Sequence, residues 1–285
     1  MILEKQILYV VATPIGNLED ISLRARDILA GVDCIAAEDT RHSSRLLQHY
    51  GINTHCVALH EHNERKVTDK LLQQIQEGQN LALISDAGTP LLSDPGYHLV
   101  KEARSRGIRV VPVPGACALI AALSASGLPT DCFYFEGFLP VKPGARCKQL
   151  AAVRNYTGTL IFYESPHRIE ETIQDMLTVF GAEREAVLAR ELTKTYETIH
   201  GDRLGALITW LAQDPNQRRG EMVILVHGAE KRDESDITPE AERILAILQR
   251  DLPVKQAAAL TAEITGIKKN RLYQHAIAER GGNDE

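Results

Sequence analysis

The chain has 285 residues, of which 44% are hydrophobic and 25% are charged, and its formal net charge is −6. This composition is typical of a globular protein with room for two medium-sized domains. The acidic balance excludes a protein that binds nucleic acid over its whole surface, because neutralising phosphates requires an excess of Lys and Arg.

The sequence lacks the marks of membrane and secreted proteins. No apolar run approaches the roughly 20 residues of a membrane span. The first residues, MILEKQILYVVATP, have no basic leader or cleavage site for secretion. The five cysteines are odd in number and have no CxxC spacing. We therefore expect a cytoplasmic protein with reduced thiols, no metal site and no membrane contact.

The first half of the chain alternates predicted strands with predicted helices. Ser22 and Gly31 are suited to begin and end the first helix, and a helix of small residues follows Gly115. Such alternation with continuously apolar strands predicts a mainly parallel sheet covered by helices on both faces. We expect strands at residues 7–12, 34–38, 56–60, 81–85 and 109–113, and helices near 41–50, 64–77 and 96–106.

After residue 127, strand candidates outnumber helices, which predicts a mixed sheet and a second α/β domain of different topology. The polar run at 230–236 is typical of a linker, and Thr238 and Pro239 are suited to begin the helical remainder. We expect domains at 1–126, 127–232 and 237–285. The expected strands are 132–138, 159–164, 185–191, 194–201 and 221–228, and the helices 166–180 and 202–212.

Two segments are rich in basic residues. Segment 139–155 has no acid and a Pro143-Gly144 loop, and is either a solvated connector or, with Arg218-Arg219, part of an RNA surface. Near the C-terminus, two helices flank a turn at Thr265-Gly266. This is the spacing of a helix-turn-helix, although a helical cap with a solvated basic face is the alternative. The basic residues are Lys142, Arg146, Lys148 and Arg154, then Lys268, Lys269, Arg271 and Arg280.

Acidic residues follow two of the predicted strands. Glu38 and Asp39 come after the second strand and Asp86 after the fourth, at the strand ends where open α/β sheets bind ligands. Neither GxGxxG nor GxxxxGK[ST] occurs, and a carboxylate would repel phosphate, so dinucleotides and nucleoside triphosphates are disfavoured. A ligand with positive charge and ribose hydroxyls, such as S-adenosylmethionine, suits these loops. Alternatively, the acids only cap helices or pair with Arg41 and Arg45.

Seven longer motifs occur in order along nearly the whole chain: TPIGN (13–17), EDTR (38–41), HEHN (60–63), SDAGTP (85–90), VPGACALIAAL (113–123), YESPHR (163–168) and RGEMVILVHG (219–228). Together they resemble the tetrapyrrole methylase superfamily. Within it, they are similar to the enzymes that methylate a cytidine 2′-hydroxyl in small-subunit ribosomal RNA. TPIGN and SDAGTP depart from the glycine-rich first loop and the GGDP-type loop of porphyrin and corrin methylases, which counts against a tetrapyrrole substrate.

The resemblance implies two α/β domains with a helix-turn-helix-like extension, a homodimer, and S-adenosylmethionine bound between the domains. The implied substrate is cytidine 1402 of 16S rRNA, within the small ribosomal subunit. A small-molecule methyltransferase acting on a tetrapyrrole is the second possibility, and a helix-turn-helix regulator with a ligand-sensing domain is the third. The resemblance places beside the cofactor Pro14, Ser85, Asp86, Ala87, Gly88, Thr89, Pro90, Ala116, Cys117, Phe162, Tyr163, Ala189 and Met222.

Methyl transfer to a ribose hydroxyl requires that the hydroxyl be aligned and its proton removed. Arg41 and Arg168 are expected to hold RNA phosphate or to orient a carboxylate. The sequence leaves the base open among several groups. The candidates are Glu38, Asp39, Glu164 and His167.

Other polar residues are expected to have structural roles. Asp94 and Ser165-Pro166 are predicted to begin the helices that follow them. His60 and His62 lie at a spacing that would suit a metal, but no third ligand is visible in the sequence, so a polar loop beside the RNA is the favoured interpretation.

Overall fold

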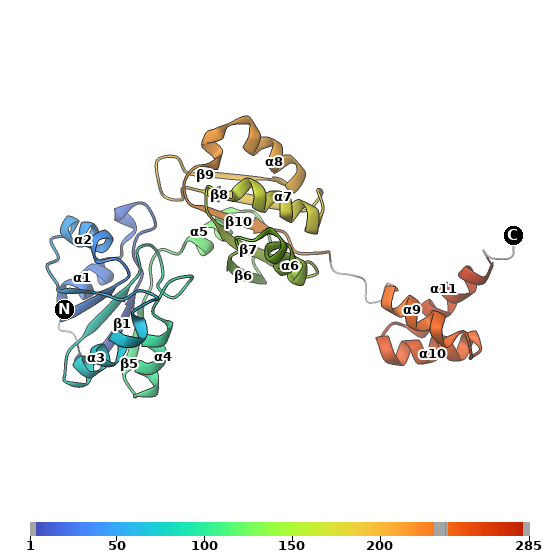
Figure 1. The fold of residues 1–285 in the computed structure, drawn as a ribbon, viewed down its shortest axis with the longest axis horizontal. Helices are drawn as coiled ribbons and strands as arrows, with labels where there is room; N and C mark the ends of the chain where they lie inside the picture. Colours follow the sequence, from blue (N-terminus) through green and yellow to red (C-terminus); the bar gives the residue numbers. More distant parts are fainter. Residues whose placement is uncertain (1–3, 231–236, 238, 282–285) are drawn as a thin grey trace. The chain divides into compact units, whose positions relative to one another are not determined.

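The computed structural model describes residues 4–230, 237 and 239–281, and the chain divides into two compact units, residues 1–229 and 230–285 (Figure 1). The first unit contains two five-stranded sheets, and the described part of the second contains three helices. Across the described ranges, no helix is both long and apolar enough to cross a membrane.

The first sheet consists of parallel strands in the order β3-β2-β4-β1-β5. Its central strands β2 and β4 are buried along their whole length, as expected for a parallel sheet covered on both faces. The mainly parallel sheet predicted from the sequence is therefore confirmed. Its strands are β1 (Ile7–Val11), β2 (Cys34–Ala37), β3 (Cys56–Ala58), β4 (Leu81–Ile84) and β5 (Arg109–Val113).

Helices cover both faces of this sheet (Figure 1). Tyr9 of β1 packs with α1 and α2, whereas its neighbour Leu8 packs with α3 and α4 on the opposite face. Ser22 begins α1 as predicted, because its Oγ accepts a hydrogen bond of 3.1 Å from the Ala25 N–H. The helices are α1 (Leu23–Gly31), α2 (Thr40–His49), α3 (Glu64–Gln76) and α4 (Tyr97–Ser105), with a 3-10 helix at Leu18–Asp20.

The second sheet has the order β6-β7-β10-β8-β9, in which β6 and β7 are parallel and the other pairs antiparallel. The predicted mixed sheet is confirmed. Three helices cover the face that contains Phe162, and α5 covers the face that contains Ile161 and Val223. The elements are α5 (Ala118–Ala125), β6 (Phe133–Phe138), α6 (Pro143–Val153), β7 (Thr159–Glu164), α7 (Ile169–Phe180), β8 (Glu185–Arg190), β9 (Thr198–Arg203), α8 (Leu204–Gln213) and β10 (Met222–Val226), with a 3-10 helix at Pro215–Arg218.

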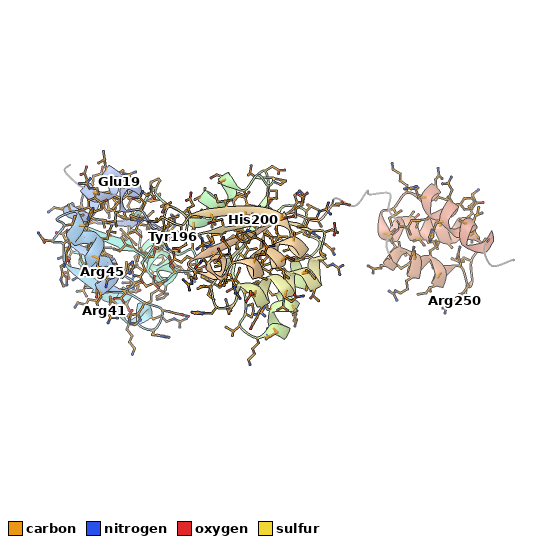
Figure 2. The ribbon with its side chains drawn as sticks, turned by 90° about the horizontal axis from the view of Figure 1, so that it is seen from above. Glu19, Arg41, Arg45, Tyr196, His200 and Arg250 are labelled. Carbon is orange, nitrogen blue, oxygen red and sulfur yellow. The ribbon has the colours of Figure 1, made fainter. Side chains whose placement is uncertain are left out.

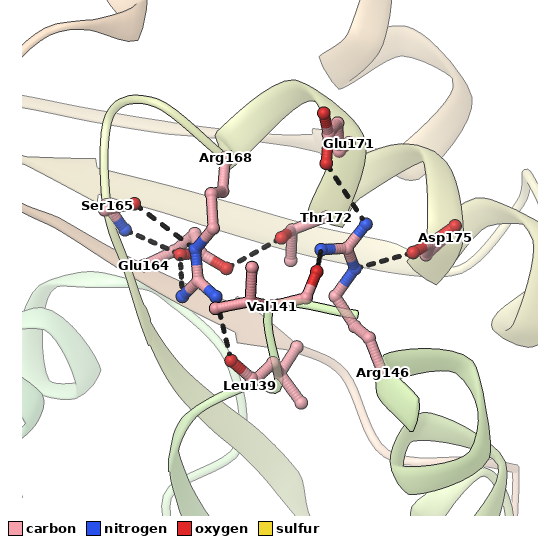
Figure 3. A network of polar contacts seen from close by, with 9 residues as sticks. All are labelled: Leu139, Val141, Arg146, Glu164, Ser165, Arg168, Glu171, Thr172 and Asp175. Carbon is pink, nitrogen blue, oxygen red and sulfur yellow. Dashed lines mark hydrogen bonds and ion pairs between the residues drawn. The ribbon is translucent and has the colours of Figure 1, made fainter. Parts of the chain in front are cut away.

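The segment 143–153 is a helix, α6, where the sequence predicts a loop with surface cations. Pro143 occupies the first turn, where its missing N–H costs no hydrogen bond. Arg146 is 1% exposed, and its Nε lies 2.6 Å from Oδ2 of Asp175, a residue 29 positions away in the chain (Figure 3). The prediction of a surface role for Arg146 is therefore wrong. The other basic residues of the segment, Lys142, Lys148 and Arg154, are exposed.

Two predicted elements begin later than expected. Helix α7 begins at Ile169, because residues 166–168 form a turn in which the Arg168 N–H donates to the Ser165 carbonyl at 3.1 Å. Ser165-Pro166 is therefore not the start of that helix. Strand β9 begins at Thr198 rather than at residue 194, because residues 191–197 form successive turns.

Helix α4 is capped differently from the prediction. It begins at Tyr97, and no side chain of its own N-terminal segment caps it. Instead, Oε1 of Glu64 in α3 accepts a hydrogen bond of 3.0 Å from the Leu99 N–H. The predicted capping role of Asp94 is wrong, and its carboxylate is left for other contacts.

The second unit has a small core made by one or more apolar residues from each helix, including Leu245, Ala258 and Leu272. The predicted turn is present, because α10 ends at Gly266 with a left-handed φ of 76° that glycine adopts without strain. Residues 231–236 of the predicted linker, Thr238 and the side chain of Arg280 lie outside the described residues. The helices are α9 (Pro239–Leu248), α10 (Val254–Thr265) and α11 (Lys269–Gly281).

Candidate active site

Two loops at the carboxyl edge of the first sheet are joined backbone to backbone. TPIGN follows β1 and SDAGTP follows β4, the neighbouring strand. The Thr13 N–H donates to the Gly88 carbonyl at 2.9 Å, and the Gly88 N–H donates back at 3.1 Å. Gly88 has a left-handed φ of 82°, which favours glycine at this point. The bridge fixes Pro14 beside the loop at 85–90.

The loops after β2 and β4 also meet. The Asp39 N–H donates to Oδ1 of Asp86 at 3.1 Å, so the acidic strand ends lie together at one edge of the sheet. Oδ1 of Asp39 accepts from the Arg41 N–H at 2.8 Å, and Oδ2 pairs with the Arg41 guanidinium at 3.2 Å. The Arg41 side chain is 92% exposed and projects from the same helix as Arg45 (Figure 2). Helix capping is therefore the observed role of Asp39.

A pocket of about 310 Å³ is lined by the loops after β1 and β4, by the start of α5 and by residues in and beside the second sheet, and its volume is ordinary for a small-molecule site. Seven of the predicted site residues line it: Ala87, Gly88, Thr89, Cys117, Tyr163, Met222 and Glu164. Sequence reasoning missed Ile15, Leu92, Ser93, Asp94, Ala118, Phe138, Ser165, Pro166, Leu192, Glu221 and Val223. Most of these residues are adjacent in the sequence to a predicted site residue. Extending each predicted motif by one residue on either side would therefore have included them.

The other residues predicted beside the cofactor are not part of the pocket lining: Pro14, Ser85, Asp86, Pro90, Ala116, Phe162 and Ala189. Pro90 is buried, and the Ala116 carbonyl accepts a hydrogen bond of 3.1 Å from the Thr89 hydroxyl. Ala189 is buried in the apolar layer under α5. The Phe162 side chain lies in the core on the opposite face of its sheet, so that only its backbone can face the pocket.

Tyr163 connects the second sheet with the helix that covers it. Its hydroxyl accepts a hydrogen bond of 3.2 Å from the Leu119 N–H at the start of α5. Burial, followed by the neighbouring Cys117 thiol, raises the pKa of Tyr163 to about 12, so the phenol stays protonated. The rings of Phe135 and Phe138 pack edge-on against it, with centroids 4.9 and 5.6 Å away. These three rings form an aromatic cluster beside the pocket.

Two leucines, Leu92 and Leu192, line the pocket, and both lie in loops that contain residues with positive φ. Each leucine lies between two non-glycine residues in the left-handed region, a conformation that costs on the order of 1 kcal/mol per residue. Such strain persists where the surrounding structure over-determines it, and it concentrates at binding sites. The flanking residues are Leu91 and Ser93 (φ 75° and 69°) and Glu191 and Thr193 (φ 50° and 65°).

The TPIGN loop contacts the turn after β8. A Cβ added to Gly16 would lie 2.5 Å from Cγ of Lys194 and 2.8 Å from Oγ1 of Thr193, so a side chain does not fit there. The Asn17 N–H donates to the Thr193 hydroxyl at 3.0 Å. This close approach holds the loop of Leu192 against the first half of the unit.

Lys194 also joins two carboxylates at the same end of the second sheet. Its Nζ lies 2.9 Å from Oε1 of Glu191 and 2.9 Å from Oε2 of Glu221, which lines the pocket. Burial alone would raise the pKa of Glu191, but hydrogen bonds from Lys194 and from the Glu221 N–H outweigh it and lower that pKa. The ion pairs therefore fix the turn that carries Leu192.

Three carboxylates gather where the acidic loops meet the pocket. Burial raises the pKa of Asp94, the charge of Asp86 raises it further, and a hydrogen bond with Ser85 opposes both. Burial, and then the charge of Asp94, raise the pKa of Glu38, whose Oε2 lies 3.5 Å from the Asp86 backbone nitrogen. Since like charges at short range disfavour ionisation, this group would be stabilised by a bound cation.

Glu164 is buried at the end of β7, and both of its carboxylate oxygens are engaged (Figure 3). Oε1 accepts from the Ser165 N–H at 2.7 Å and pairs with Nη2 of Arg168 at 2.6 Å, while Oε2 accepts from the Thr172 hydroxyl at 2.7 Å. Arg168 also donates from Nη1 to the Leu139 carbonyl at 3.0 Å. Arg168 thus orients a carboxylate, one of its two predicted roles.

The histidines singled out in the sequence lie away from the pocket lining. His167 is exposed in the turn before α7. The rings of His60 and His62 are 6.1 Å apart, and Asn63 closes their loop by accepting from the His60 N–H at 2.9 Å. Over the part of the chain that the structure describes, no three His, Cys, Asp or Glu side chains are grouped in a way that could hold a metal ion.

Comparisons with known proteins agree with this architecture. Residues 7–208 match the family of Tetrapyrrole (Corrin/Porphyrin) Methylases, and residues 235–280 match the RsmI C-terminal HTH domain. The chain is 57% identical over 274 residues to Ribosomal RNA small subunit methyltransferase I of Escherichia coli O157:H7, with 96% of each chain covered. It is 59% identical over 275 residues to the protein of that name from Pseudomonas aeruginosa, with 96% and 98% covered.

The fold is also similar to a crystal structure of uroporphyrin-III C-methyl transferase from Thermus thermophilus in complex with S-adenyl homocysteine. The TM-score is 0.54 at 18% identity, over 76% of this chain and 96% of that one. The chain therefore belongs to the tetrapyrrole methylase family, whose members are S-adenosylmethionine-dependent methyltransferases, as the motifs predict. Within that family, its full-length relatives are the proteins named Ribosomal RNA small subunit methyltransferase I, and its last unit is the predicted helix-turn-helix domain.

Proposed function

We propose that this protein transfers a methyl group from S-adenosylmethionine to the ribose 2′-hydroxyl of a cytidine in 16S rRNA, cytidine 1402 of the decoding region. The pocket supports the proposal most directly, because loops of the first sheet face Tyr163 and Met222 of the second. The names of the full-length relatives support rRNA as the substrate. We also propose that it acts in the cytoplasm as a homodimer on the small ribosomal subunit, with domains at 1–126, 127–232 and 237–285.

The pocket has the chemistry that S-adenosylmethionine requires. Ile15, Leu92 and Leu192 supply apolar surface suited to an adenine ring, and backbone groups of Ala87 and Thr89 are placed to hydrogen-bond a ribose. The carboxylates around Asp94 favour a cationic ligand. When bound, the cofactor supplies an electrophilic methyl group on a sulfonium. The residues that would hold it are Ala87, Gly88, Thr89, Cys117, Tyr163 and Met222, which line the pocket, with Pro14 and Asp86 in the loops that carry lining residues.

Among the carboxylates near the pocket, Asp94 is the best placed to accept the ribose proton. Asp94, Glu164 and Glu221 all line the pocket, but Glu164 is hydrogen-bonded through both oxygens and Glu221 is paired with Lys194. Asp39 is outside the lining and caps α2. A raised pKa makes Asp94 a stronger base while it is ionised. Glu38 lies near Asp94 and is also a candidate for the base. Single-turnover assays of Asp94→Asn and Glu38→Gln distinguish which of the two carboxylates accepts the proton. Only the change that slows methyl transfer at saturating substrates marks the base.

Two exposed side chains outside the pocket lining are suited to contact RNA phosphate rather than the reacting hydroxyl. Arg41 projects into solvent from α2, and His167 is exposed before α7. A phosphate contact positions RNA without changing the chemistry. We therefore assign these two residues to substrate binding.

The proposed function is tested by methyl transfer to isolated ribosomal subunits. Small subunits from a strain that lacks this protein should accept a labelled methyl group from S-adenosylmethionine. Subunits from the wild-type strain, already methylated, are the matched control and should accept none. The product nucleotide should be a 2′-O-methylcytidine at the expected position. Methylation of a base, of the large subunit or of no RNA at all would contradict the proposal.

A further inference from the structure

Phe138 is an exposed aromatic residue in the wall of the pocket. Its side chain is 53% exposed, although only 5% of the chain is aromatic and most apolar residues of the second sheet are buried. The ring lines the pocket together with Ser165, Pro166 and Asp94. A small cofactor is usually buried over roughly 70–90% of its surface. A half-exposed ring is therefore placed for a larger ligand that enters from solvent.

A β-bulge in β6 turns Phe138 toward the pocket. Phe135 pairs with Ile161 of β7, and the next pairs are Gly137 with Phe162 and Phe138 with Tyr163, so the residue between is extra. Paired residues share a face, and Ile161 and Tyr163 belong to the face covered by α5. In a regular ladder that continued from the Phe135–Ile161 pair, Phe138 would pair with Glu164 and point to the opposite face of the sheet.

Glycine at position 137 makes this bulge possible. Its φ is 76°, in the left-handed region, and a Cβ there would lie 3.2 Å from Oγ of Ser93, the residue before Asp94. On the other side of Phe138, Leu139 is buried and its carbonyl accepts the hydrogen bond from Arg168. The ring of Phe138 is therefore exposed, but its backbone is fixed on both sides.

We propose that Phe138 is a stacking platform for the nucleobase whose ribose is methylated. This inference rests on the proposed function and deepens it by assigning the base a site of its own. Enzymes that do chemistry on a base move it out of its stack into a pocket of aromatic or apolar side chains. Proteins that bind single strands likewise stack bases on aromatic side chains. Phe138, with Pro166 beside it in the pocket wall, offers such a surface.

The test compares Phe138→Ala with the wild-type protein on two small-subunit substrates. One subunit carries the natural cytidine at the methylated position, and the other carries an abasic ribose introduced by ligation of the rRNA before reconstitution. On the natural substrate, we expect kcat/KM to fall about tenfold to a hundredfold, the range of a lost base stack. On the abasic substrate, the variant and the wild type should differ by less than about twofold, because no base is present to stack.

Matched variants separate stacking from folding. Phe138→Trp should restore kcat/KM to within about threefold of wild type, since any large ring can stack. Phe133→Ala removes an aromatic side chain on the same strand that is 40% exposed and does not line the pocket, and it should have no effect. S-adenosylhomocysteine, titrated calorimetrically, should bind Phe138→Ala as it binds the wild type.

Three results would overturn the inference. The first is an equal loss on the natural and abasic substrates, which would mean a structural role. The second is a matching loss of S-adenosylhomocysteine affinity, which would place the ring against the cofactor. The third is unchanged kinetics for Phe138→Ala while the wild type methylates normally. Absence of methyl transfer by the wild-type protein would contradict the proposed function itself and is distinguishable from all three.

Discussion

The carboxylate of Glu164 and the guanidinium of Arg168 form a buried ion pair at the end of β7, with Oε1 2.6 Å from Nη2. The same arginine reaches the Leu139 carbonyl, and the same carboxylate accepts from Thr172. One pair thereby connects the strand β7, the helix α7 and the segment after β6. It stabilises the pocket wall and engages both oxygens of Glu164, which leaves this carboxylate poorly suited to act as a base.

Replacing Glu164 by Gln should lower the free energy of unfolding by about 3 kcal/mol, because Arg168 would keep a largely buried charge without its partner. Urea denaturation followed by circular dichroism measures the change. Glu170→Gln is the control, since its pair with Arg218 is on the surface, and it should cost less than about 1 kcal/mol. Equal effects of the two changes would contradict the buried pair.

Arg146→Leu should also destabilise the protein by about 3 kcal/mol, because Asp175 would lose the guanidinium that compensates its charge. Lys148→Ala, at an exposed position of the same helix, should change the free energy of unfolding by less than about 0.5 kcal/mol. Differential scanning calorimetry of both variants is sufficient. A larger effect for Lys148 would mean that α6 packs differently from this description.

Stability should depend on pH through Asp94 and Glu38. Burial and neighbouring charges raise both pKa values in the folded protein, so the folded state binds more protons than the unfolded chain between the ordinary carboxyl pKa, near about 4, and the raised values. The free energy of unfolding should therefore fall as pH rises through that window. In Asp94→Asn, the decline should be shallower, as measured by urea titrations at several pH values. A steeper decline would contradict the assigned sign.

Gly16→Ala should weaken the binding of S-adenosylhomocysteine about tenfold, because the added methyl group would push the TPIGN loop away from Lys194 and Thr193 and widen the pocket. Isothermal titration calorimetry gives the affinity. Gly144→Ala is the matched control, since a Cβ at Gly144 would meet no other atom within 4 Å and the φ there is not left-handed. Unchanged affinity in Gly16→Ala would show that the contact does not shape the pocket.

The basic residues at the start of α11 should contribute to RNA binding electrostatically. Lys268 and Lys269 are exposed, and replacing both by Ala should make the plot of log affinity against log salt less steep by about 1 to 2 units. Lys66 and Lys70, two exposed lysines of α3, provide a variant with the same change in net charge. If both double variants lowered the slope equally, α11 would have no particular role.

Regular elements of this protein are largely predictable from its sequence. The strands of the first sheet are short apolar runs, as expected for strands that are buried on both faces, so the sequence identifies them directly. Ser22 begins α1, because its hydroxyl is suited to cap a helix. The helix α6 was not predictable in the same way. Its sequence is basic and begins with Pro143-Gly144, and its inner face is set by Asp175, which lies in another helix.

The sequence predicted which loops form the site, but it did not predict all the side chains that line the pocket. Through the resemblance to a family, the motifs identified residues 87–89, Cys117, Tyr163 and Met222, all of which line the pocket. Asp94 was assigned to a helix cap, since nothing in the local sequence indicates that Glu64 supplies the acceptor instead. Phe138 depends on a bulge, and a bulge follows from the register of a neighbouring strand that a single sequence does not display.

The residues with left-handed φ beside Leu92 and Leu192 imply that a rigid pocket is obtained at the expense of the melting temperature. Glycine or asparagine at Ser93 would relieve the backbone, because these residues adopt positive φ at lower cost, whereas replacing Thr193 would also remove the hydrogen bond from the Asn17 N–H. The Ser93 variant should therefore melt at a higher temperature than the wild type, yet Leu92 would lose a backbone constraint that orients it towards the pocket. Four costly backbone conformations thus accompany the pocket, and thermostabilised variants selected without regard to activity should accumulate changes at Ser93.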